Sequence, residues 1–200
     1  MGNREDFLKS ICEEKYGKGQ HPAPALGALL PDQLSEINRI YKDLGGLLPD
    51  APYKFAKYDI PVKDFIIELD EQEHFNRYRY NTLDSSIYEK CLNFDKVAYM
   101  AYCAKYEDKC RTNGKFGSSP SADKQFGKID SDDLEWSRWK QRAFYDLVKD
   151  AYSIAKKLPI IRISIYDEYN GETINDLLKS HKKTKLLAYV EERYKKAKGL

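Results

Sequence analysis

The chain has 200 residues, with 34 Lys and Arg against 32 Asp and Glu and a formal net charge of +2. This length is enough for one domain with its own hydrophobic core, without disulfides or a structural metal. The nearly balanced charge excludes a global attraction to polyanions, so any nucleic-acid surface has to come from local segregation of charge. We therefore expect a single domain over residues 1–200.

The cysteines and the hydropathy of the chain indicate a cytoplasmic protein. The four cysteines form no CxxC pair and have no histidine at zinc spacing, which favours free thiols. No apolar run approaches the ~20 residues of a transmembrane helix. The N-terminus does not resemble a signal peptide, and Asp6 stands where N-myristoylation needs Ser or Thr. The expected protein is neither membrane-spanning nor lipid-anchored.

The first third of the chain predicts two helices and a hairpin. Apolar residues at helical spacing predict helices over Arg4–Glu14 and over Pro31–Leu44, and Gly45-Gly46 ends the second. Tyr53–Tyr58 alternates aromatic residues and lysines as a strand does, and Phe65–Leu69 is a β-branched run typical of a buried strand. The short connection between these two strands predicts a hairpin.

The middle of the chain predicts helices followed by a mobile loop. Gln72–Tyr106 has mostly helical periodicity, whereas Arg111–Asp130 is rich in Gly, Ser, Lys and Asp and has no periodicity. We interpret residues 76–131 as a helical and loop insertion that serves specificity or DNA contacts.

The last third predicts a long helix feeding a strand. Asp132–Lys156 is amphipathic at helical period, Leu158–Ile165 is an apolar strand, and short helices near Thr173–Ser180 and Lys183–Lys196 close the chain. The order of elements predicts an α/β fold, with a mixed β-sheet core flanked by helices.

Several carboxylates lie at the end of a strand that is too apolar for a surface edge, in the segment YDIPVKDFIIELDEQEHF (residues 58–75). Residues two apart in a strand share a face, so Glu68 and Asp70 point the same way while Leu69 points into the core. Asp59 on the neighbouring strand adds a third carboxylate. Clustered carboxylates repel one another unless a cation neutralises them, and hard oxygen ligands suit Mg²⁺ or Mn²⁺. Asp59, Glu68 and Asp70 are therefore the expected metal ligands.

This segment resembles the core signature of the PD-(D/E)XK nuclease superfamily, particularly the branch of short-patch-repair and phage endonucleases, which reads roughly D-(x)n-IE-x-D-G-x-x-H-F. Asp59 matches the first acid, with Asp64 as the alternative, and Glu68 matches the second. Asp70 stands at the position of the usual lysine, and His74 matches the histidine.

A second part of the resemblance lies near residues 146–163. DLVKDAY followed by PIIRI is similar to the family's lysine-bearing helix and the strand after it. The resemblance implies a restriction-endonuclease-like fold, a divalent metal and hydrolysis of phosphodiester bonds in DNA by a restriction or phage-type endonuclease. Lys149 would orient water or phosphate, and His74 would support catalysis.

Asn76–Asn81 interleaves cations, amides and aromatic residues, the combination that grips phosphates and stacks on bases. The expected nucleic-acid contacts are Arg77, Tyr78, Arg79, Asn81 and, from the later strand, Arg162. Trp136 and Trp139 at helical spacing favour core packing instead. Cutting both strands of a duplex commonly needs two symmetric active sites, so we expect a homodimer, and a methyltransferase or another defence or repair subunit is a further candidate partner.

Two other interpretations remain open at this point. A fold by itself does not confer activity, so the chain could be a noncatalytic nucleic-acid-binding or interaction module, which should ignore Mg²⁺. It could also be an RNA-specific or structure-specific nuclease, because contacts to the 2′-OH cannot be read from one sequence.

Overall fold

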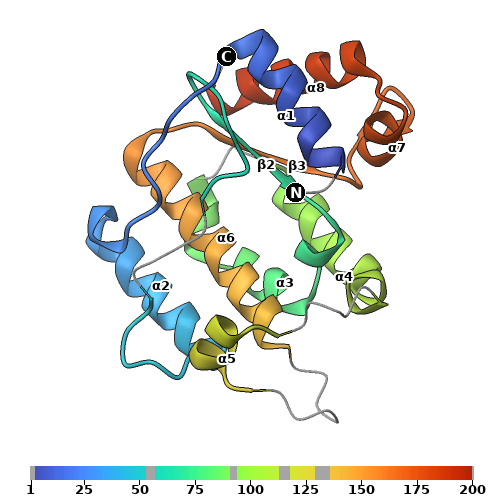
Figure 1. Cartoon of the computed structure of the whole chain (residues 1–200). Coiled ribbons are helices and arrows are strands. Elements are labelled where there is room, and N and C mark those ends of the chain that lie inside the picture. The colour runs from blue at the N-terminus through green and yellow to red at the C-terminus, as the bar shows by residue number, and fades with distance from the viewer. Residues whose placement is uncertain (1–2, 53–56, 91–93, 113–117, 129–135, 200) are drawn as a thin grey trace.

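The computed structural model describes residues 3–52, 57–90, 94–112, 118–128 and 136–199 (Figure 1). Its helices are α1 (Asn3–Tyr16), α2 (Pro31–Asp43), α3 (Arg77–Leu83), α4 (Lys96–Thr112), α5 (Pro120–Phe126), α6 (Ser137–Lys156), α7 (Ile174–Lys179) and α8 (Lys183–Ala197). Its strands are β1 (Ile60–Pro61), β2 (Ile66–Asp70), β3 (Ile160–Ser164), β4 (Glu168–Tyr169) and β5 (Glu172–Thr173). Short 3₁₀ helices span Leu26–Ala28, Gln72–His74 and Ser86–Lys90. This arrangement confirms the coarse prediction of an α/β fold.

The larger sheet has the strand order β1-β2-β3 and is mixed. β1 pairs with β2 in antiparallel fashion, while β2 and β3 run parallel, with Glu68 beside Arg162 in the register. Parallel neighbours need a crossover connection, and α6 provides its last part. The predicted hairpin is present, but its first strand is Ile60–Pro61. Residues 57–58 of the strand predicted at 53–58 are not strand, and 53–56 lie outside the described residues.

The two faces of the sheet bury different kinds of side chain. All five residues of β2 and of β3 are buried. Ile67 and Leu69 join an apolar cluster with residues of α1, α7 and α8, which cover one side of the sheet (Figure 1). On the opposite face, Glu68 and Arg162 contact residues of α6, and Asp70 pairs with Arg162. Buried charges need partners, so this second face must be a network of ion pairs.

Local signals explain where the helices begin and end. α2 starts with Pro31 in its first turn, where the missing N–H costs nothing, and Gly45 follows its end at φ +82°. α6 packs Leu147, Val148 and Ala151 into the larger apolar cluster. The helices predicted near both ends of the chain are confirmed, since they form as α1, α2, α7 and α8.

The loop expected at 111–130 is partly wrong. Residues 120–126 form α5, whose N-cap Ser119 accepts a hydrogen bond from the Ala122 N–H at 3.2 Å. Phe126 anchors α5 by packing against Tyr41 with ring centroids 5.3 Å apart, so tertiary contacts stabilise a helix that the composition did not predict. Residues 113–117 and 129–135 lie outside the described residues.

Cys12, Cys103 and Cys110 are buried free thiols, and Cys91 lies outside the described residues. Across the described ranges, no helix combines the length and the apolar composition that crossing a bilayer requires. Trp139 is buried in the core and Trp136 packs against it, as their spacing predicts.

Candidate active site

A polar pocket of about 230 Å³ lies at the carboxyl end of β2. It is lined by residues from α1, from the approach to β1, from the end of β2 and from α6. The residues that α6 contributes are Arg138, Arg142, Tyr145, Asp146 and Lys149. These positions recur at helical spacing, so α6 presents one continuous polar stripe to the pocket.

Asp59, Glu68 and Lys149, called the pocket cluster below, are joined by hydrogen bonds. Lys149 Nζ donates to Glu68 Oε2 at 2.5 Å, and the Asp59 N–H donates to Glu68 Oε1 at 3.2 Å. Asp59 Oδ2 accepts from the Leu69 N–H at 3.1 Å, which ties the residue before β1 to β2. The structure thus brings these three predicted residues together. Asp64, the alternative first acid, is exposed in the bend before β2.

The charges of the pocket cluster are not balanced. Burial, together with the charge of Asp59, raises the pKa of Glu68 to about 8. Burial also raises the pKa of Glu5 on α1, and Asp59 adds to this increase. Burial alone would lower the pKa of Lys149, but Glu68 and Asp59 raise it and keep the ammonium charged. Asp59 and Glu68 therefore share one ammonium, with the carboxyl group of Glu5 close enough to interact with Asp59, and a further cation would stabilise this arrangement.

His74 is held in one orientation at the edge of the same pocket. Its Nδ1 lies 2.8 Å from Asp146 Oδ2 and 3.2 Å from Asp70 Oδ1. Arg162 and His74 outweigh the effect of burial and hold the pKa of Asp146 well below its usual value, so that carboxylate is an acceptor. Nδ1 must therefore carry the proton, which leaves Nε2 to accept or donate one proton elsewhere.

A second group of charges is fully buried between β2, β3, α3 and α6. This Arg162 network comprises Arg162, Asp70, Asp146, Asp150, Arg79 and Tyr88. Arg162 Nη1 donates to both oxygens of Asp70 at 2.8 and 3.1 Å, and its Nε donates to Asp150 Oδ1 at 2.7 Å. The second oxygen of Asp150 accepts from Arg79 at 3.1 Å. Each guanidinium is thus matched to carboxylates with good geometry.

These contacts change the expected role of Asp70. The sequence predicts Asp70 as a metal ligand beside Asp59 and Glu68, but its recorded partners are Arg162 and His74. Asp70, His74 and Asp146 do place one ligand atom each within 4.8 Å of one another, which is a spacing a metal could use. Arg162 already occupies both oxygens of Asp70 and one of Asp146, so this trio suits the guanidinium better than a second cation.

Three of the five predicted nucleic-acid contacts are buried. Arg79 and Arg162 are 1% and 0% exposed and belong to the Arg162 network, and Tyr78 is 6% exposed. These three side chains do not reach the surface where phosphates or bases could bind, because Tyr78 and Arg79 on α3 and Arg162 on β3 turn into the core. Arg77 is exposed and paired with Glu107, and Asn81 is exposed at a different pocket.

Two residues of the pocket wall were missed at the sequence level. Arg138 and Arg142 line the pocket one helical turn apart, and burial and then the charge of Arg142 lower the pKa of Arg138. Their spacing from Lys149 would have revealed the shared face of α6. The adjacent Trp136 and Trp139 predict core packing for this segment and give no sign of a polar pocket wall.

The fold and this pocket define a mixed α/β protein with an acidic cluster and a cationic wall. A family model described as "Family of unknown function (DUF7255)" matches residues 39–180, and the chain belongs to this family. The match contains the pocket cluster, His74 and both wall arginines. Neither a curated protein nor a solved structure matches the chain.

Proposed function

We propose that this protein is a metal-dependent endonuclease that hydrolyses phosphodiester bonds in DNA. The observation that carries the proposal is that Asp59 and Lys149 line one pocket with Arg138 and Arg142, while the buried Glu68 is hydrogen-bonded to both Asp59 and Lys149. Carboxylates suited to a cation and side chains suited to a phosphate are thereby placed at the same opening. The resemblance to PD-(D/E)XK nucleases gives this combination its chemical interpretation.

The wall arginines support an anionic substrate. Arg138 and Arg142 are four residues apart on α6, where like charges repel and destabilise a helix. The lowered pKa of Arg138 has the same origin, since burial and the neighbouring guanidinium both disfavour its charge. A phosphate between them would relieve this repulsion and accept hydrogen bonds from both forks. Lys57, which also lines the pocket, adds a third cation.

The donor set fits Mg²⁺ or Mn²⁺. Asp59 and Glu68 offer hard carboxylate oxygens, and their mutual repulsion is part of what raises the pKa of Glu68. Asp59, which lines the pocket, would hold the ion, and Glu68 would join it by giving up its hydrogen bond from Lys149. Glu5 is close enough to Asp59 for their charges to interact. When bound, such an ion stabilises negative charge on a phosphate and makes water more acidic.

The remaining roles follow from the positions of the side chains. Lys149 donates to Glu68 and opposes the rise of its pKa, and it offers its ammonium to a phosphate oxygen or to water in the pocket. His74 has its Nδ1 proton fixed by Asp70 and Asp146, so Nε2 is the atom able to exchange a proton with substrate or water. Arg138 and Arg142 would orient the phosphate.

The test compares Asp59→Asn with Asp64→Asn. Both substitutions remove one carboxylate near β1, but that of Asp59 lies at the pocket and raises the pKa of Glu68, whereas that of Asp64 is exposed and serves as the matched control. Supercoiled plasmid and single-stranded RNA are incubated with each protein in Mg²⁺, Mn²⁺ or EDTA. We expect metal-dependent cleavage of the plasmid by the parent and the control, and a loss of at least about a hundredfold in Asp59→Asn.

Each other outcome leads to a different conclusion. Cleavage that survives in Asp59→Asn and is lost in Asp64→Asn would move the first acid to Asp64. Cleavage of RNA alone would change the substrate class. If the parent protein shows no heat of Mg²⁺ binding and no cleavage while it still binds DNA, the noncatalytic interpretation replaces the nuclease.

A further inference from the structure

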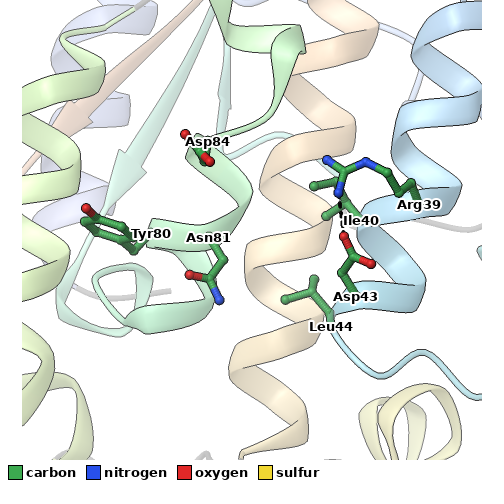
Figure 2. Close-up of a pocket in the computed structure, with 7 residues that line it drawn as sticks. All are labelled: Arg39, Ile40, Asp43, Leu44, Tyr80, Asn81 and Asp84. Carbon is green, nitrogen blue, oxygen red and sulfur yellow. Dashed lines mark hydrogen bonds and ion pairs between the residues drawn. The ribbon is translucent and has the colours of Figure 1, made fainter.

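A second pocket, of about 300 Å³, lies between the C-terminal turns of α2 and α3 (Figure 2). Arg39, Ile40, Asp43 and Leu44 line it from the side of α2. Tyr80, Asn81 and Asp84 line it from α3 and its end. It shares no lining residue with the pocket of the candidate active site. The nuclease proposal leaves this pocket unused.

The charge of this second pocket is negative. Arg39 is neutralised locally, because it donates to both oxygens of Glu36 at 2.7 Å and to Asp43 at 2.5 Å. Asp84 has no ion-pair partner among the residues that the structure describes, and Figure 2 draws it across the pocket from that pair. The C-terminus of α2 adds the negative end of a thirteen-residue helix. An additional positive charge is therefore favoured between the two helices.

The apolar part of the pocket indicates which kind of ligand should carry that positive charge. Ile40 and Leu44 are buried and form apolar lining, while the ring of Tyr80 is 41% exposed. A flexible alkyl chain can lie on the aliphatic residues while its charged end reaches a carboxylate. An aromatic ring beside that cation adds a cation–π attraction. A bare metal ion would use none of the apolar surface.

We propose that this pocket receives an arginine or lysine side chain presented by a partner protein. Asp84 would bind the cationic group, Ile40 and Leu44 would contact its alkyl stem, and Tyr80 would contact the partner at the edge of the pocket. An exposed tyrosine at the edge of a pocket is a typical anchor of protein–protein interfaces, where arginine is its frequent counterpart. The charge complementarity makes the partner basic at this contact.

The same charges argue against one predicted contact. Asn81, expected to touch nucleic acid, lies in this pocket together with Asp43 and Asp84. A phosphate placed there would be repelled by both carboxylates. This face of the protein therefore suits a basic protein partner and leaves nucleic acid to the pocket with the arginine wall.

The experiment uses the whole protein labelled with ¹⁵N and follows its amide resonances during titration. The probe is acetyl-Gly-Arg-Gly-amide, and the control is the same peptide with citrulline, which has the shape of arginine without its charge. We expect binding in the millimolar range, as is usual for a fragment of this size, with shifts confined to the ends of α2 and α3. Citrulline should produce at least about tenfold weaker binding.

Variants locate the binding side chains. Asp84→Asn should weaken arginine-peptide binding about tenfold, and Tyr80→Leu should weaken it less. Asp108→Asn on α4, whose side chain is 96% exposed, is the matched control and should bind as the parent does. Both pocket variants alter exposed residues, so their amide spectra should otherwise match the parent spectrum.

Several outcomes would overturn the proposal. Equal binding of the citrulline peptide would show that the pocket does not recognise a positive charge. Resonance shifts that lie elsewhere, or no shifts up to the solubility limit of the peptide, would show that this pocket is not the binding site. Binding of agmatine without binding of the peptide would assign the pocket to a free amine. An oligonucleotide that shifts these same resonances, and loses that effect in Tyr80→Leu, would return the surface to nucleic acid.

Discussion

The pocket cluster and the Arg162 network are built on the same strands and the same helix, yet they differ in how their charges are satisfied. In the Arg162 network, one guanidinium donates to three different aspartates, and the side chains of all these residues are at most 3% exposed. In the pocket cluster, the carboxyl groups of Asp59 and Glu68 share one ammonium, and Asp59 reaches the pocket. The Arg162 network meets the pocket only through Asp146, which is already paired, whereas the unbalanced pocket cluster has the capacity to bind a ligand.

This difference separates structural charges from candidate functional ones on a single face of the sheet. Burial alone would have grouped Glu68, Asp70 and Arg162 together, because all three are essentially inaccessible. Burial, however, raises the pKa of Glu68, whereas three aspartates raise the pKa of Arg162 despite its burial. A buried acid with a raised pKa beside a cleft is a candidate for function. A cation that is already paired with several carboxylates has a structural role.

The largest effect on stability should come from Arg162→Met. The substitution leaves Asp70, Asp146 and Asp150 buried without their shared cation, and breaking a buried ion network in this way costs about 3–5 kcal/mol. Urea denaturation followed by circular dichroism measures the loss. Arg162→Lys keeps the charge but not the three-way geometry and should recover only part of it. A loss below about 1 kcal/mol would show that the network is not structural.

Glu68 and Lys149 can be removed together, so that neither is left without the other. We expect the double variant Glu68→Gln/Lys149→Met to be destabilised less than the sum of its single variants, since each single change strands the other charge. Its cleavage of plasmid should nevertheless fall at least about a hundredfold. Near-parent cleavage by a stably folded double variant would assign the pocket cluster to the scaffold.

A smaller effect is expected at the pocket wall. Arg142→Gln removes one of two neighbouring cations and should weaken DNA binding about tenfold, with a shallower dependence of affinity on salt. Fluorescence anisotropy at several salt concentrations measures both quantities. Arg193→Gln, on α8 outside this pocket, is the comparison. An equal weakening in both variants would indicate nonspecific charge rather than a phosphate site.

The smallest effect concerns how the free energy of unfolding depends on pH in acid. Arg162 and His74 hold the pKa of Asp146 below its ordinary value of 3.8 despite burial. The ionised carboxylate therefore contributes stability at pH values above 3.8, and this contribution is lost as the pH falls through the lower folded-state pKa. Asp146→Asn should flatten the fall of the unfolding free energy below that pH. An unchanged slope in urea titrations at acid pH would contradict the assignment.

Hydropathy and helical period were sufficient to predict most of the scaffold. The runs around Ile66–Leu69 and Ile160–Ile163 are too apolar and β-branched to be anything but buried strands, and both form. The period-two rule also placed Glu68 and Asp70 on one face. Local signals failed at residues 120–126, where packing of Phe126 stabilises a helix within a polar segment.

The sequence by itself determined that Glu68 and Asp70 share one face of a strand, with Asp59 on the neighbouring strand, and its resemblance to a nuclease family added Lys149. Only the tertiary structure decided that Arg162 forms an ion pair with Asp70, that Arg79 is buried against Asp150, and that Arg138 and Arg142 face the pocket. The physical reason is that periodicity describes an element's own geometry, whereas the partner of a charged side chain depends on which other element packs against that face.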